Sequence, residues 1–296
     1  MPLVLSIIIC TYNRSSWLRV CLNSLLPQCQ DDSVEVLVVD NNSTDDTASV
    51  VREFSDRCPH VKYVPEPAQG LSYARNRGIK EALGRIVAYI DDDGRAHPDW
   101  VRTILKFFEG TPNASGVGGP YYAFSSVTIP PWFPKEYGNK SLGEEARLLQ
   151  SGEWLSGTNM IFTKDALVEI GGFDTSIGMS GTKISYGEET NLVMKLRERG
   201  KLVYYCPEMR VDHAILPYKL RLSWLLRSNF SSGYAGVTTF NHTGGAGSYI
   251  PRLLWSMVRA CGLFVSSNER YLKTRIYRSF SRLCWDVGFF AKLVGL

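Results

Sequence analysis

The feature that most constrains the fold is an alternation of short apolar runs with amphipathic helical stretches over the first third of the chain. The apolar runs consist mainly of Val and Ile, which is typical of strands buried on both faces. Apolar residues recur at helical spacing between them, as in the stretch after Ser15, a residue expected to cap its helix. The predicted strands are 4–10, 34–39, 61–65 and 86–90, and the predicted helices are 15–26, 44–54 and 71–83, with Gly84 ending the last. This rhythm predicts βαβ units in an α/β domain with a mostly parallel sheet.

The pattern loosens in the middle of the chain and then returns. The stretch 116–150 is rich in aromatic residues and prolines and predicts an ordered aromatic loop. Beyond it we expect a strand at 157–163, a short helix, a helix at 188–199 ended by Gly200, and a strand at 202–206.

Polar side chains follow directly after three of the predicted strands. They are Thr11, Tyr12 and Asn13, then Asp40, Asn41 and Asn42, and finally Asp91, Asp92 and Asp93. Parallel α/β sheets bind ligands beyond the carboxyl ends of their strands. One polar exit is an ordinary turn, because Asp and Asn are common turn residues. Three such exits together favour a binding site.

The acidic triplet Asp91, Asp92 and Asp93 is the strongest local signal. Carboxylates this close repel one another and raise one another's pKa, and a divalent cation relieves that repulsion. Oxygen ligands suit Mg²⁺ or Mn²⁺, and such a metal could bridge a diphosphate and stabilise a leaving nucleotide. Acidic triplets are also common on solvated loops, so the motif by itself leaves both readings open.

Two further groups of residues carry possible chemistry. Ser185 and Glu188 have the spacing of a capping box, which explains Glu188 structurally and leaves Glu189 without such a role. The helix dipole keeps a carboxylate in the first helical turn ionised, and a general base for a hydroxyl must be ionised. Glu189 could equally have no role beyond complementing the helix dipole. His213 follows the strand at 202–206, and a lone histidine is more often structural than a ligand.

Taken in order, the motifs resemble those of the family 2 inverting glycosyltransferases of GT-A fold. The matching segments are 6–14, 38–45, Gly70, 74–76, Gly78, 89–93, 171–174, 187–189 and His213, and together they cover roughly residues 4–215. The resemblance implies a Rossmann-like, mostly parallel central sheet flanked by helices. It also implies transfer of a sugar from a nucleoside-diphosphate sugar, with UDP-sugar expected as donor, to a hydroxyl of a saccharide or lipid-linked glycan in polysaccharide or glycoconjugate biosynthesis.

The same resemblance implies roles for individual residues. Those expected at the nucleotide and diphosphate are Thr11, Tyr12, Asn13, Asp40, Arg75, Asp91 and Asp92. The metal, Mn²⁺ or Mg²⁺, is expected on Asp93 and His213, and Glu189 is expected as the catalytic base. Trp154, Gly157, Thr158, Asn159 and Glu188 are expected near donor sugar or acceptor. In the family the base is usually Asp, so Glu189 is a departure that leaves its neighbour Glu188 as the alternative.

The composition changes beyond Pro217, where basic residues are interleaved with Trp, Phe and Leu. We therefore expect a catalytic domain at 1–216 and a basic amphipathic helical extension at 217–296. Such helices suit peripheral contact with an anionic membrane, which fits a lipid-linked acceptor. They could instead cover the catalytic domain or pair in a dimer.

Composition limits the remaining possibilities. The formal net charge of +4 is too small to imply nucleic-acid binding by itself. Seven dispersed cysteines without a C-x-x-C pair read as reduced thiols, and no uncharged apolar stretch has the length of a membrane span, so we expect a location at the cytoplasmic face of the membrane. Two alternative functions remain. One is a nucleotidyltransferase, but the sequence lacks the phosphate-binding loop expected of that class. The other is a non-catalytic GT-A scaffold, but such a protein would have lost the carboxylates that are present here. The sequence does not identify the sugar, the acceptor, the linkage or the oligomeric state.

Overall fold

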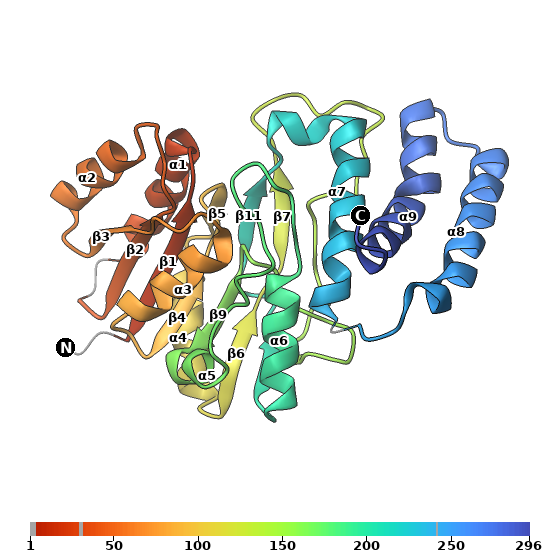
Figure 1. Ribbon diagram of the computed structural model, residues 1–296. Helices are drawn as coiled ribbons and strands as arrows, with labels where there is room; N and C mark the ends of the chain where they lie inside the picture. Colours follow the sequence, from red (N-terminus) through yellow and green to blue (C-terminus); the bar gives the residue numbers. More distant parts are fainter. Residues whose placement is uncertain (1–3, 30–31, 241) are drawn as a thin grey trace. The chain divides into compact units, whose positions relative to one another are not determined.

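The computed structural model describes residues 4–29, 32–240 and 242–296 (Figure 1). Its contacts divide the chain into two compact units. The first unit comprises the chain up to Phe124 together with Gly138–Thr175 and Glu189–Ala214. The second unit comprises Ser125–Tyr137, Ser176–Glu188 and Ile215–Leu296.

The first unit is built on a large mixed sheet. Within the described residues eight strands form this sheet in the order β3-β2-β1-β4-β9-β6-β10-β8. The strands are β1 (Leu5–Thr11), β2 (Val34–Asp40), β3 (Val61–Pro65), β4 (Ile86–Tyr89), β6 (Ala114–Gly118), β8 (Arg147–Leu148), β9 (Met160–Thr163) and β10 (Leu202–Tyr205). The four pairings β3–β2, β2–β1, β1–β4 and β6–β10 are parallel, and β9 runs antiparallel between β4 and β6. The predicted mostly parallel α/β sheet is therefore confirmed, with β9 and β8 as its antiparallel members.

Helices cover both faces of this sheet because the side chains of its buried strands alternate between the faces. Ile7 and Ile9 of β1 pack with the helices of one face, and Ile8 packs with those of the other. The first face carries α1 (Ser15–Leu25), α2 (Thr47–Arg57) and α4 (Trp100–Gly110), and the second carries α3 (Leu71–Glu81), α5 (Lys164–Glu169) and α6 (Glu188–Glu198).

A second, three-stranded sheet lies within the first unit. It has the order β5-β11-β7, formed by β5 (Gly94–Ala96), β11 (Val211–Ala214) and β7 (Tyr121–Phe124). β11 pairs antiparallel with β5 and parallel with β7. This sheet is not predictable from the sequence pattern, because its strands are too short to show a period.

Several helix boundaries differ from the prediction. Ser15 is the first residue of α1 and not its cap; its backbone N–H donates to Oδ2 of Asp45 at 2.9 Å. Asp45 also accepts from the backbone N–H of Thr47, so α2 begins at Thr47, after the predicted start. Gly84 does not end α3, which stops at Glu81; a Cβ at Gly84 would lie 2.7 Å from the backbone nitrogen of Ser6.

The second unit is dominated by three helices at the C-terminal end of the chain. They are α7 (Leu222–Thr239), α8 (Ala246–Ser266) and α9 (Leu272–Leu293), preceded by the short 3₁₀ helix η2 (Pro217–Leu220). α7 packs closely on α9, because a Cβ at Gly233 would lie 1.8 Å from the carbonyl oxygen of Trp285 and one at Gly288 2.0 Å from that of Phe230. Over the described part of the chain, no helix is both long and apolar enough to cross a membrane.

Candidate active site

The three polar strand exits lie side by side at one edge of the large sheet. β1 lies between β2 and β4 and is parallel to both. The backbone N–H of Asn41 donates to the carbonyl oxygen of Thr11 at 2.9 Å, and Oγ1 of Thr11 donates to Oδ2 of Asp92 at 2.8 Å. Hydrogen bonds thus join the exits of β2, β1 and β4, where the fold favours ligand binding.

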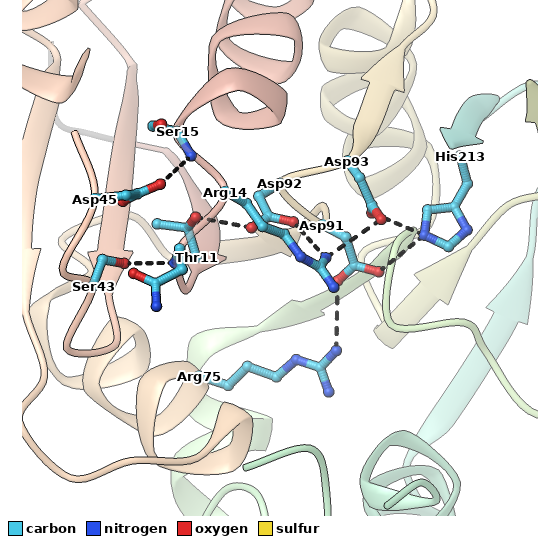
Figure 2. A network of polar contacts seen from close by, with 11 residues as sticks. Thr11, Arg14, Ser15, Ser43, Asp45, Arg75, Asp91, Asp92, Asp93 and His213 are labelled. Carbon is cyan, nitrogen blue, oxygen red and sulfur yellow. Dashed lines mark hydrogen bonds and ion pairs between the residues drawn. The ribbon is translucent and has the colours of Figure 1, made fainter. Parts of the chain in front are cut away.

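Asp91, Asp93 and His213 converge on one point (Figure 2). Nε2 of His213 lies 2.9 Å from Oδ1 of Asp93 and 3.8 Å from Oδ2 of Asp91. One donor atom from each of the three residues lies within 4.8 Å of the others. Asp93 is buried, while Asp91 and His213 are half-buried and remain accessible.

The small sheet explains why His213 meets the acidic triplet. His213 in β11 is the register partner of Gly94 in β5, the residue directly after Asp93. The backbone N–H of Ala214 donates to the carbonyl oxygen of Asp93 at 3.0 Å. Pairing of these two short strands therefore fixes the imidazole beside the carboxylates.

The electrostatics of the triplet favour a bound cation. Removal from water raises the pKa of Asp91 and of Asp92 above the usual range of an aspartate, and repulsion from Asp93 adds to both shifts. Arg75 opposes the shift at Asp91 and Arg14 opposes it at Asp92. Two carboxylates and one imidazole fit a divalent metal such as Mn²⁺, since carboxylate oxygens are its preferred ligands and a single nitrogen is tolerated.

Arg14 is a site residue that the sequence analysis misses. Its Nη1 lies 3.0 Å from Oδ1 of Asp92 and 3.4 Å from Oδ2 of Asp93, while 30% of its side chain stays exposed (Figure 2). The available signal was its position as the basic residue at the end of the Thr-Tyr-Asn-Arg run, which begins at the last residue of β1. A guanidinium at this position can form charge-assisted hydrogen bonds with carboxylates or with a phosphate group.

Arg75, Gly157 and Glu189 lie next to the acidic triplet. Nη2 of the buried Arg75 is 3.8 Å from Oδ1 of Asp91, and its guanidinium stands 5.2 Å from the ring centre of Phe173. A Cβ at Gly157 would lie 2.3 Å from Nη2 of Arg75 and 3.1 Å from Oε1 of Glu189. Gly157 therefore allows the guanidinium and the carboxylate to approach the same backbone.

The surroundings of Glu189 include two more residues that sequence reasoning misses. Burial raises the pKa of Tyr121, and the charge of Glu189 raises it further. Burial lowers the pKa of Lys140, while Glu189 acts in the opposite direction. Among the described residues, Oε2 of Glu189 is buried without a hydrogen-bond partner. The carboxylate of Glu189 therefore keeps acceptor capacity that no described protein group uses.

Asp40, Asn13 and Tyr12 lie toward the β2 side of the same sheet edge. The carboxylate of Asp40 accepts from the backbone N–H of Ser43 at 2.9 Å and from the hydroxyl of Tyr63 at 2.7 Å. Asn13 adopts a left-handed φ of 52°, and its Oδ1 accepts from the backbone N–H of Thr44 at 2.7 Å. These bonds hold the loops that follow β1 and β2. The half-buried Tyr12 lies in the same turn as Asn13.

The predicted sugar-contacting residues separate into two kinds. The amide of Asn159 is saturated by protein, since it accepts from Nε1 of Trp100 at 2.9 Å and donates to the carbonyl oxygens of Pro120 and Met209 at 3.0 and 2.6 Å. Trp154 is 39% exposed, and its carbonyl oxygen accepts from Nζ of Lys140 at 2.7 Å. The side chain of Asn159 thus joins α4 to the segments that lead into β7 and β11, whereas Trp154 remains exposed.

The capping box expected at Ser185 is not formed. A cap at Ser185 requires a helix from residue 186, whereas α6 begins at Glu188, directly after Gly187 in a left-handed conformation with φ 104°. Glu188 therefore opens the helix and does not occupy its third position. Glu188 belongs to the second unit, while Glu189 belongs to the first with Asp91, Asp93 and His213.

Comparison with known proteins agrees with this geometry. The sequence model described as "Glycosyl transferase family 2" matches residues 6–171. The chain is 30% identical over 239 residues to the glucosyl-dolichyl phosphate glucuronosyltransferase of Haloferax volcanii, covering 78% of this chain and 75% of that protein.

Two solved structures are similar in fold. One is the mannosyltransferase PcManGT of Pyrobaculum calidifontis in complex with GDP-Man and Mn²⁺, at TM-score 0.58 and 18% identity, covering 100% of this chain and 76% of that one. The other is GalNAc-T7 with UDP, GalNAc and Mn²⁺, at TM-score 0.57 and 17% identity, covering 72% of this chain and 43% of that one.

Proposed function

This chain belongs to glycosyl transferase family 2 and is a glycosyltransferase, and we propose that it moves a sugar from a UDP-sugar to a hydroxyl of a saccharide or lipid-linked glycan, with inversion at the anomeric carbon. The observation that carries the proposal is the convergence of Asp91, Asp93 and His213 within 4.8 Å at the carboxyl edge of the sheet. These residues would hold a divalent metal. When bound, the metal stabilises negative charge that develops on the diphosphate leaving group.

The chain's own residues would perform the proton transfer and the positioning. Glu189 accepts the proton of the acceptor hydroxyl on its carboxylate. The hydroxyl oxygen bonds to the anomeric carbon as the bond from that carbon to the diphosphate oxygen breaks on the opposite face. Arg75 and Arg14, which lie against Asp91 and Asp92, supply positive charge beside the leaving diphosphate.

The remaining predicted residues would divide between nucleotide and sugar. We place the nucleotide over Thr11, Tyr12, Asn13 and Asp40, at the β1 and β2 exits. Trp154 offers an exposed ring for a sugar, and Thr158 has a buried Oγ1 without a hydrogen-bond partner among the described residues. UDP is favoured by the resemblance of the β1 and β2 exits to their family counterparts; the two similar structures carry GDP and UDP respectively, so both belong in the test.

The proposal also covers the acceptor of the sugar and the location of the enzyme in the cell. The similar protein of Haloferax volcanii is named a glucosyl-dolichyl phosphate glucuronosyltransferase, which supports a lipid-linked acceptor here. We propose that residues 1–216 form the catalytic domain and that helices within 217–296 bring the enzyme to the cytoplasmic face of the membrane.

Calorimetric titration of UDP and of GDP, each with Mn²⁺ and with the metal chelated, tests this function. We expect UDP to bind with Mn²⁺ and to lose most of its affinity on chelation. Tighter binding of GDP would overturn the uridine assignment, and binding that ignores chelation would overturn the metal assignment.

A further inference from the structure

Asp40 is a buried carboxylate that only neutral groups hold in place. It is the last residue of β2 and is 4% exposed. Oδ1 accepts from the backbone N–H of Ser43, and Oδ2 accepts from the hydroxyl of Tyr63. Within the described part of the chain no Lys, Arg or His forms an ion pair with Asp40. A carboxylate has about four acceptor positions, so Asp40 keeps acceptor capacity that these two bonds do not use.

Tyr63 reaches Asp40 diagonally across two neighbouring strands. Its register partner in the parallel pair of β2 and β3 is Val38, two residues before Asp40, so the side chains of Tyr63 and Asp40 lie on the same face. The distance of 2.7 Å is that of a hydrogen bond from a hydroxyl to an ionised acceptor. Removal of the hydroxyl from water, together with its bond to Asp40, raises the pKa of Tyr63 to about 12. The phenol therefore stays protonated and remains a donor at neutral pH.

The bond does more for Asp40 than for Tyr63. Tyr63 is 43% exposed, and a tyrosine this exposed can bond to water instead. Tyr73 of α3 does so at 41% exposure, because its hydroxyl has no partner among the residues that the structure describes. For Asp40, in contrast, one bond to each oxygen fixes the plane of the carboxylate. With the bond from Ser43 alone, the carboxylate could turn about that contact.

We propose that Tyr63 is a positioning residue for recognition of the base: it fixes the plane of the Asp40 carboxylate so that the unused acceptor positions meet the N3–H of uracil. The inference rests on the proposed function, which places a uridine nucleotide over Asp40, and it adds the residue that orients this carboxylate. Because the donors that hold Asp40 are neutral, its charge is not cancelled, and the bond to N3–H is charge-assisted. Cytosine has a lone pair at N3 in place of the N–H, so an oriented carboxylate repels it.

Calorimetric titration of UDP and of CDP with Mn²⁺, on the parent chain and on Tyr63→Phe, tests the proposal. The substitution keeps the ring and removes only the hydroxyl. We expect the affinity for UDP to fall by at least about fivefold, because hydrogen bonds to charged groups are the stronger ones. The weaker affinity for CDP should stay nearly the same, since CDP lacks the N3–H that the oriented carboxylate accepts. The ratio of the two affinities is a readout that a merely structural role would not change.

Tyr73→Phe is the matched control. It removes the hydroxyl of a similarly exposed tyrosine that has no partner in the described residues, so UDP and CDP should bind as they do to the parent chain. A urea midpoint near that of the parent chain would show that Tyr63→Phe is folded.

The outcomes separate this inference from the proposed function. If the parent chain binds UDP with Mn²⁺, but Tyr63→Phe leaves the UDP affinity unchanged or weakens UDP and CDP equally, the positioning role is overturned and the proposed function stands. If the parent chain does not bind UDP, or binds CDP as tightly as UDP, the uridine assignment itself is overturned, and the role of Tyr63 with it.

Discussion

Nε2 of His213 in β11 lies 2.9 Å from Oδ1 of Asp93, the residue directly before β5, and only the pairing of β11 with β5 in the small sheet brings the two residues together. If the pair forms part of a metal site, His213→Ala should weaken Mn²⁺-dependent UDP binding by at least about tenfold, because even residues behind the ligands change metal affinity by that much. Calorimetry at a series of Mn²⁺ concentrations measures the change.

His97 provides the control for that variant. Its Nε2 lies 3.5 Å from Oδ1 of Asp212, so it is also a histidine beside an aspartate, but it is not part of the cluster of Asp91, Asp93 and His213. His97→Ala should leave the Mn²⁺ dependence unchanged. Equal effects of the two variants would argue against a metal role for His213.

Glu189→Gln should lower the rate of transfer by about 10²–10⁴-fold, since the amide cannot accept the proton of the acceptor hydroxyl. UDP binding with Mn²⁺ should stay near that of the parent chain, because Gln has almost the same shape and the base acts on the acceptor. Product formation from the sugar donor and calorimetry with UDP, on the same preparation, test both statements.

Glu188→Gln is the matched comparison, because the two glutamates are neighbours at the start of α6 and the absence of the capping box removes one argument for choosing between them. We expect Glu188→Gln to retain most of the activity. A large loss in Glu188→Gln together with an active Glu189→Gln would reverse the assignment.

Asp286→Ala should destabilise the second unit. Asp286 has 0% exposure and is bonded by Tyr249, Ser256 and Arg282, all of which would lose their acceptor. The buried hydroxyls of Tyr249 and Ser256 would be left without an acceptor, which typically costs about 1–3 kcal/mol for each group. Urea denaturation measures the loss. Glu269→Ala, which breaks a more exposed ion pair with Arg278, should cost less than about 1 kcal/mol.

Protonation of Glu35 should make the first unit less stable at acid pH. Burial by itself raises the pKa of Glu35, but hydrogen bonds from Lys62, Ser6 and the backbone N–H of Leu83 together lower it below its usual value near 4.5. The unfolded chain therefore takes up the proton first. The stabilising contribution is present above about pH 4.5 and is lost as pH falls through the folded pKa.

Urea midpoints at a series of pH values test this titration. Glu35→Gln should be less stable than the parent chain at neutral pH and should show a flatter dependence of stability on pH in the acid range. Glu145→Gln, at an exposed position, should follow the parent curve. An unchanged acid slope in Glu35→Gln would show that other groups control the titration.

The sequence by itself determined the strands and helices of the first half and the strand exits that carry Thr11, Asp40 and Asp91. Buried parallel strands leave continuous apolar runs and their helices leave a helical period, so both signals are local and readable. The sequence also placed the acidic triplet at a strand end, because the apolar run of β4 stops directly before it.

Only the tertiary structure decided what meets these elements. β5 and β11 are short strands without a period, so the contact of His213 with Asp93 depends on a pairing between distant segments. Arg14, Lys140 and Tyr121 joined the site for the same reason, and the start of α1 depends on Asp45 from another loop. The charge pattern of the C-terminal helices was visible in the sequence, but packing decided which of their faces are buried. α7 and α9 pack closely on each other, and the hydroxyls of Tyr249 and Ser256 in α8 bond to Asp286 of α9.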